Sequence, residues 1–228
     1  MEKISVIIPY HNEEKTLDVT FNLIINQTYK PDEVIFINSS STDNSELLID
    51  DFIENNNRSG IFFQNIFKNT NTPGGSSNVG IALARNDIVG FMDCGLIFEK
   101  DWLEKQLDYL LRDNLDVILG SCILDGIGIV DTACVCHTYG YLRNRQCHPG
   151  SLVRKKLFDK IGIFQDRRAG FDVQWMGMLI KNNVRHTYNK NSIVRYNGIN
   201  FAGSLNSALK KSIIYTREST GLENYKTP

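Results

Sequence analysis

The stretch DIVGFMDCGLIFEKDW, residues 87–102, decides the fold of this chain. Its first half is a continuous apolar run that includes the β-branched residues Ile88 and Val89, as expected of a strand with both faces buried. The run ends at Asp93, and a helical pattern begins a few residues later, near Asp101. Strands of this kind occur mostly in parallel sheets that carry helices on each side. We therefore predict an inner strand over residues 88–93, with Asp93 at its carboxyl end.

Strand and helix patterns alternate on both sides of this stretch, which indicates βαβ units and a mostly parallel sheet. Before it, short runs of β-branched and aromatic residues predict strands over 4–9, 33–38 and 61–65. After it, the pattern predicts helices over 101–113, 154–162 and 172–183, strands over 115–124, 185–189 and 192–196, and a basic helix over 204–218. The segment 69–78 has the composition of a loop ahead of a short helix over 78–84, whereas residues 125–150 have no clean period.

The composition is that of one soluble globular domain over residues 1–228, with 42% apolar and 22% charged residues. Lys and Arg number 25 against 26 Asp and Glu, so no broad basic surface, and hence no nucleic-acid partner, is expected. The sequence has no apolar run long enough for a membrane span and no leader-like segment after Met1, so we expect a cytoplasmic protein. The five cysteines lack paired C-x-x-C spacing, which favours reduced thiols over a disulfide framework or a zinc site.

Polar turns follow the predicted strands of the first half, at the sheet edge where open α/β folds bind their ligands. These turns are PYHNEE (9–14), NSSSTDNS (38–45), NTPGGSSN (71–78) and DCG (93–95). Together with RRAGFD (167–172), they resemble the family 2 glycosyltransferases of GT-A fold in order and spacing. The family's own motifs are a PxYNxE-like turn, a DDGSTD-like turn, a PGxSxARNxG-like turn, a DxD strand end and an RAGED-like stretch.

The resemblance implies a single GT-A-like α/β domain, whose central and mostly parallel sheet is flanked by helices, the fold of nucleotide-diphospho-sugar transferases. Residues 1–95 would form the nucleotide-binding half, and residues 96–228 the acceptor side with a C-terminal helix. It also implies an inverting transfer of a sugar from a nucleotide-diphosphate donor, a UDP-sugar foremost, to a hydroxyl. The acceptor would be a glycan or a lipid-linked molecule in polysaccharide or glycan biosynthesis, which suits a protein associated peripherally with the inner face of the membrane.

The resemblance also assigns roles to residues, position by position. Asp172 corresponds to the catalytic base, which takes a proton from the attacking hydroxyl. The residues that correspond to donor contacts are Pro9, Tyr10, Asn12, Glu13, Ser39, Gly74, Gly75, Asn78 and Asp93, with Arg168 close to the diphosphate. The two glycines would let the backbone approach the ligand, and the helix N-terminus that follows them would favour an anion.

Three positions depart from the family pattern. Ser39 stands where an aspartate usually accepts the N3 hydrogen of uracil, and Phe171 replaces the glutamate that precedes the base. Gly95 replaces the second acid of DxD, which leaves Asp93 as the carboxylate for Mn²⁺ or Mg²⁺; no other cofactor is expected. We expect weak metal binding, compensation by Arg168 or its neighbour, and a restored metal ligand in Gly95→Asp. These departures keep an alternative open, a catalytically inactive glycosyltransferase-like protein with a binding or scaffolding role.

Overall fold

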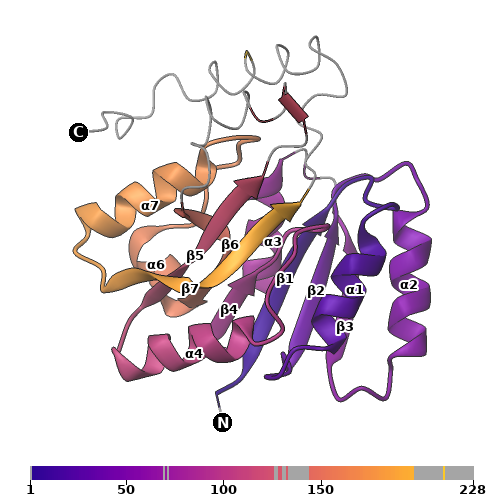
Figure 1. Cartoon of the computed structure of the whole chain (residues 1–228), viewed down its shortest axis with the longest axis horizontal. Coiled ribbons are helices and arrows are strands. Elements are labelled where there is room, and N and C mark those ends of the chain that lie inside the picture. The colour runs from indigo at the N-terminus through magenta and orange to yellow at the C-terminus, as the bar shows by residue number, and fades with distance from the viewer. Residues whose placement is uncertain are drawn as a thin grey trace.

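A seven-stranded mixed sheet forms the centre of the structure, a computed structural model that describes residues 2–68, 70, 72–125, 128–129, 132, 144–197 and 213 (Figure 1). The strands of the described part are β1 (Ile4–Tyr10), β2 (Glu33–Asn38), β3 (Phe62–Phe67), β4 (Ile88–Phe91), β5 (Val117–Asp125), β6 (Arg145–Arg154) and β7 (His186–Asn197). Its helices are α1 (Leu17–Ile25), α2 (Ser45–Asn55), α3 (Pro73–Leu83), α4 (Trp102–Arg112), α6 (Lys156–Ile161) and α7 (Phe171–Lys181).

The strand order is β3-β2-β1-β4-β6-β5-β7. β1 pairs in parallel with β2 and β4, and β2 pairs in parallel with β3. β6 runs antiparallel to both β4 and β5, and β7 is parallel to β5. The predicted α/β fold with a mostly parallel sheet is therefore confirmed. Because β6 is reversed, its first residues lie at the same sheet edge as the carboxyl ends of β1, β2 and β4.

Helices cover both faces of the sheet (Figure 1). Apolar side chains of α1, α2 and α4 pack with one face, and those of α3, α6 and α7 pack with the other. The strands β1, β2 and β4 are buried at every position except the partly buried Pro9, as the apolar run around Ile88 predicts. None of the helices in the described part of the chain is long and apolar enough to cross a bilayer.

Two predictions of local structure were wrong. Helix α3 begins at Pro73, not near Asn78, because Thr72 caps it and proline fits the first helical position. Strand β6 was not predicted, since Pro149 and Gly150 interrupt the apolar pattern within it. The predicted strands over 185–189 and 192–196 form one strand, β7, and the predicted helix over 204–218 falls almost wholly outside the described residues.

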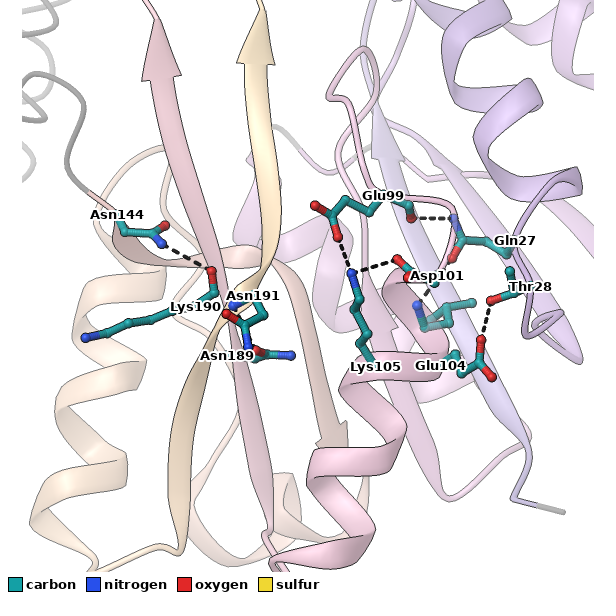
Figure 2. Close-up of polar contacts among 11 residues, drawn as sticks. Gln27, Thr28, Glu99, Asp101, Glu104, Lys105, Asn144, Asn189, Lys190 and Asn191 are labelled. Atoms are coloured by element: carbon teal, nitrogen blue, oxygen red, sulfur yellow. Dashed lines mark hydrogen bonds and ion pairs between the residues drawn. The ribbon is translucent and has the colours of Figure 1, made fainter.

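Charged side chains at the start of α4 are paired within the fold (Figure 2). The Lys105 ammonium contacts the Glu99 carboxylate at 2.5 Å and the Asp101 carboxylate at 3.0 Å. Gln27 ties the same turn to α1, donating to the Glu99 carbonyl at 3.1 Å and accepting from the Leu103 N–H at 3.2 Å. Glu99 and Asp101, the acids that follow residues 93–95, thus stabilise the start of α4.

Candidate active site

Three carboxylates from separate elements lie together at the carboxyl edge of the sheet. Asp93 follows β4, Asp172 lies in the first turn of α7, and Glu13 lies in the turn after β1. Burial is the main cause that raises the pKa of Asp93 to about 7, and the charges of Asp172 and Glu13 contribute to the same shift. Asp93 is therefore close enough to Asp172 and to Glu13 for their charges to repel its own, and a cation or a proton at Asp93 would relieve that repulsion.

Burial also raises the pKa of the other two acids. For Asp172 the N–H groups of the first helical turn oppose this effect, because they donate to the carboxylate. For Glu13 the opposing group is the Thr16 hydroxyl, which donates to the carboxylate at 2.5 Å. An acid with a raised pKa binds a proton more readily than an exposed one, which is the property required of a general base.

Aromatic packing holds Asp172 in place. Gly170, at φ +74°, turns the chain into α7, and Phe171 then packs edge-on against His148 at 5.5 Å between ring centroids. His148 also contacts the ring of Phe91 at 4.3 Å and that of Phe164 at 4.8 Å. Burial lowers the pKa of His148 to about 3, so its ring is neutral at physiological pH. Phe171 thus fixes the start of α7 by packing.

Gly95 lies in a conformation that does not accept an acid. Its φ is +72°, and a Cβ atom built on it would lie 2.9 Å from the Thr16 Cβ. Its N–H donates to the Thr20 hydroxyl at 3.0 Å, which fixes the turn further. The restoration of a metal ligand by Gly95→Asp stays a prediction, and this geometry counts against it because the new side chain would need a left-handed backbone and a displacement of Thr16.

The donor set for a divalent cation consists of carboxylate oxygens, the ligands that Mn²⁺ and Mg²⁺ prefer. Asp93 is the residue that would hold the ion, and the negative charges of Glu13 and Asp172 act on it from nearby. Among the described residues there is no preformed group of three His, Cys, Asp or Glu side chains with the spacing of a metal site. This chemistry fits a cation held by one or two carboxylates and by phosphate oxygens of a substrate.

The N-terminus of α3 is covered by the chain itself. Gly74 and Gly75 are buried, and a Cβ atom on Gly74 would collide with the carbonyl oxygen of Gln165. The Thr72 hydroxyl accepts from the Gly75 N–H at 3.0 Å and contacts the carboxylate of Asp166. In this structure the two glycines thus let the loop before α7 pack closely on α3, where the sequence predicted an approach of phosphate.

Two further predicted donor contacts point elsewhere. Tyr10 is 2% exposed, and its hydroxyl donates to the Asn65 side chain at 2.8 Å. Asn78 donates to the Phe164 carbonyl at 2.8 Å and accepts from the Phe164 N–H at 3.1 Å. Both side chains are therefore hydrogen-bonded within the protein, and their contact with a donor stays a prediction.

Asn12 fastens the first turn to the second. Its φ of +57° is in the left-handed region that asparagine tolerates. Its side-chain oxygen accepts from the Thr42 N–H at 2.7 Å, and its own N–H donates to the Ser41 hydroxyl at 3.1 Å. Asn12 thereby holds its neighbour Glu13 at the site.

The remaining predicted residues lie at the same edge or beside it. Pro9 is paired with Ile37 near the ends of β1 and β2, and Ser39 follows β2 directly. Arg168 is exposed on the loop before α7, four residues ahead of Asp172. Its contact with a diphosphate stays a prediction.

Sequence reasoning missed two residues of the site. His11 is exposed, and its Nδ1 lies 2.8 Å from the Ser39 carbonyl, so the ring bridges the first and second turns. Thr16 both holds the Glu13 carboxylate and fills the space beside Gly95. An imidazole in a turn that follows a strand was a usable signal for His11. The part played by Thr16 depends on a contact across the turn that no sequence pattern reports.

The chain is similar to known proteins in both sequence and fold. The model of the family described as "Glycosyl transferase family 2" matches residues 5–146. An uncharacterized glycosyltransferase of Haemophilus influenzae is 33% identical over 55% of this chain and 50% of its own. The poly(ribitol-phosphate) beta-N-acetylglucosaminyltransferase TarP of Staphylococcus aureus is 29% identical over 56% of this chain and 39% of its own. The chain thus matches half or less of the length of these relatives.

Solved structures share the fold. TarS of S. aureus (its 1–349 fragment) superposes with a TM-score of 0.63 at 20% identity, over 85% of this chain and 60% of its own. The mannosyltransferase PcManGT from Pyrobaculum calidifontis, solved with GDP-Man and Mn²⁺, superposes with a TM-score of 0.61 at 15% identity, over 85% and 56%. At these identities the likeness concerns the fold, and the fold places the carboxylate cluster at the ligand-binding edge of the sheet.

Proposed function

The chain belongs to glycosyl transferase family 2, and from that premise we propose that it transfers a sugar from a nucleotide-diphosphate donor to an acceptor hydroxyl, with inversion. One observation carries this proposal. Asp93 and Asp172, from two distant parts of the sequence, interact at the carboxyl edge of the sheet. This pairs a donor-side carboxylate with an acid able to act as a base, and the transfer needs both.

Asp172 takes the proton of the acceptor hydroxyl in this proposal. Its raised pKa makes it a stronger base than an exposed aspartate, and the rigid packing of Phe171 and His148 keeps it oriented. The hydroxyl oxygen then attacks the anomeric carbon from the face opposite the leaving nucleotide diphosphate. Attack from that face inverts the configuration at the anomeric carbon.

Asp93 lies on the donor side. Its carboxylate would hold a divalent cation, which when bound would stabilise the negative charge of the departing diphosphate. Arg168 is close in sequence to Asp172 and exposed, so it is available to contact the same diphosphate. A cation at Asp93 would also lower the repulsion that Asp93 meets from Asp172 and Glu13, and nucleotide and metal are therefore expected to bind together.

The relatives suggest a class of donor and acceptor. TarS has been solved with UDP-GlcNAc, and WfgD of Escherichia coli is described as a beta-1,3-glucosyltransferase that acts on a diphosphoundecaprenol-linked GlcNAc. AmsB of Erwinia amylovora serves amylovoran biosynthesis. We therefore propose a UDP-sugar donor and a glycan or lipid-linked acceptor, used in building a polysaccharide at the inner face of the membrane.

The test begins with a panel of nucleotide sugars, followed by Asp172→Asn on the donor that reacts. Removal of a general base should lower kcat by about 10²–10⁴-fold. The affinity for the donor nucleotide, measured by calorimetry, should change little because the base acts on the acceptor. The matched control is Asp159→Asn, at an exposed acid in α6.

Undiminished turnover in Asp172→Asn would remove this residue from the mechanism. Tight nucleotide binding without transfer to any acceptor would favour the alternative of an inactive binding protein. Absence of binding to every nucleotide would contradict the proposed function as a whole.

A further inference from the structure

Three hydroxyl groups form a connected cluster beside the carboxyl ends of β2 and β3. Ser39 directly follows β2, Thr70 lies shortly after β3, and Ser76 is in the first turns of α3. The Ser76 oxygen lies 2.6 Å from the Ser39 oxygen and 2.5 Å from that of Thr70. Ser76 is fully buried, whereas Ser39 and Thr70 are partly exposed. Ser76 is therefore the inner member of the cluster, and the other two border the solvent.

The number of hydroxyl protons determines which oxygen donates and which accepts in each hydrogen bond of the cluster. The Ser76 oxygen also lies 3.1 Å from the carbonyl oxygen of Thr72, and a carbonyl can only accept. The single hydroxyl proton of Ser76 must therefore point to Thr72 if that contact is attractive. Ser76 then has two lone pairs left, one for each neighbour, so Ser39 and Thr70 must both donate to it. In any other arrangement one of the three contacts places two lone pairs against each other.

The long alternative contact of Thr70 does not change this assignment. The Thr70 oxygen lies 3.4 Å from the Lys68 carbonyl, which is near the limit for a hydrogen bond. Its contact with Ser76 is much shorter, so the Thr70 proton points to Ser76. Ser39 and Thr70 thus direct their protons inward and leave oxygen lone pairs toward the solvent.

When serine replaces aspartate, the side chain normally loses its negative charge and is no longer restricted to accepting hydrogen bonds. A carboxylate only accepts hydrogen bonds, whereas a free hydroxyl can rotate and either donate or accept. The contact with Ser76 removes that freedom, because the Ser39 proton is already used. Ser39 therefore presents an acceptor to a ligand, as a carboxylate would, but without a negative charge.

We propose that Ser76 is a positioning residue for base selection, which makes Ser39 accept from a pyrimidine that carries a hydrogen on N3. Uracil and thymine have that hydrogen, whereas cytosine has a lone pair at N3 that would face the Ser39 lone pairs. The site should therefore select uridine or thymidine diphosphate donors over cytidine diphosphate donors. This inference rests on the proposed function, since it assumes that the base of a donor nucleotide lies against Ser39.

The experiment is calorimetric titration of UDP, CDP and N3-methyl-UDP into the full chain, all in the presence of Mn²⁺. One lost hydrogen bond with an opposed pair of acceptors corresponds to a decrease of about tenfold or more in affinity. We expect UDP to bind more tightly than both CDP and N3-methyl-UDP by about that factor. In Ser76→Ala the Ser39 hydroxyl is free to rotate, and the ratio of UDP to CDP affinity should fall toward one.

The matched control is Ser77→Ala, which removes a neighbouring buried hydroxyl of the same helix outside the cluster and should leave the ratio unchanged. A second variant, Ser39→Ala, removes the acceptor itself and should abolish the penalty for N3-methylation even if Ser76→Ala does not fold. A purely structural role of Ser76 would lower stability and all affinities together without changing their ratio.

Equal binding of UDP and CDP by the wild type would overturn this inference and leave the proposed function intact. An unchanged ratio in folded Ser76→Ala would overturn it as well. Failure of every nucleotide to bind would instead contradict the proposed function, and the inference with it.

Discussion

The backbone conformation of Gly95 limits which side chains the turn after β4 can accommodate. Its positive φ and its contact with Thr16 predict that Gly95→Ala and Gly95→Asp both lower the free energy of unfolding by roughly 1–3 kcal/mol. Gly60→Ala is the matched control, since Gly60 has φ +84° but open space around it. The free energy of unfolding is measured with urea, and any loss in Gly95→Ala beyond that in Gly60→Ala reports the collision with Thr16. A stable Gly95→Asp protein that gains tight Mn²⁺-dependent nucleotide binding would contradict this account.

Asp93 makes the stability of the protein depend on pH. Its pKa is about 7 in the fold against an ordinary value of 3.8, so the native state binds the proton more tightly than the unfolded state. For a raised carboxyl pKa the unfolding free energy decreases as pH rises from about 4 through about 7. Asp93→Asn should remove that contribution, so the variant gains stability relative to the wild type at pH 8 more than at pH 4.

The measurement for Asp93 is the free energy of unfolding of both proteins across that pH range without nucleotide or metal. A difference between them that does not change with pH would show that Asp93 keeps its ordinary pKa.

At the scale of elements, α3 and the loop before α7 depend on each other. In Gly74→Ala the new Cβ atom would meet the backbone carbonyl of Gln165, so the loop that leads to Asp172 has to move. We expect a loss of about 1–3 kcal/mol in stability and a larger loss in kcat than in nucleotide affinity.

Gly75→Ala is the control for this prediction, because its Cβ atom would meet the carboxylate of Asp166, at 2.7 Å, the movable end of a side chain. Equal kinetic effects of the two substitutions, measured by steady-state kinetics, would argue against coupling through the Gln165 backbone.

Elements with regular patterns could be predicted from the sequence, whereas α3 and β6 could not. Apolar runs such as that around Ile88 identify strands because burial on both faces leaves little room for polar residues. Helix α3 starts with Pro73, Gly74 and Gly75, which read as a turn, but Thr72 caps the helix there and the glycines leave room for the backbone of Gln165. Prediction of the site was limited in the same way, since Asp93 and Asp172 could be placed by motif, whereas the hydrogen bonds of Tyr10 and Asn78 within the fold could not be read from a motif.

At the scale of the whole molecule, a bound donor nucleotide should stabilise the domain. With UDP at one hundred times its dissociation constant, the free energy of unfolding should increase by about 2.7 kcal/mol. The Asp172→Asn variant should show the same increase, because its donor side is unchanged. Thermal and urea unfolding with and without UDP provide the measurement, and a much smaller increase in the variant would place Asp172 in donor binding.

The order of strands in the sheet also bears on how the chain is made. β1 meets β4 through pairs such as Ile4 with Ile88, and β4 meets the reversed strand β6 through pairs such as Ile88 with Arg154. These pairings join segments that leave the ribosome at very different times, and α7, which carries Asp172, is made after all three of these strands. Asp93 and the two acids that repel it, Glu13 and Asp172, therefore meet only when most of the domain has been synthesised, so a nascent chain carries no assembled charge cluster while its core is still forming.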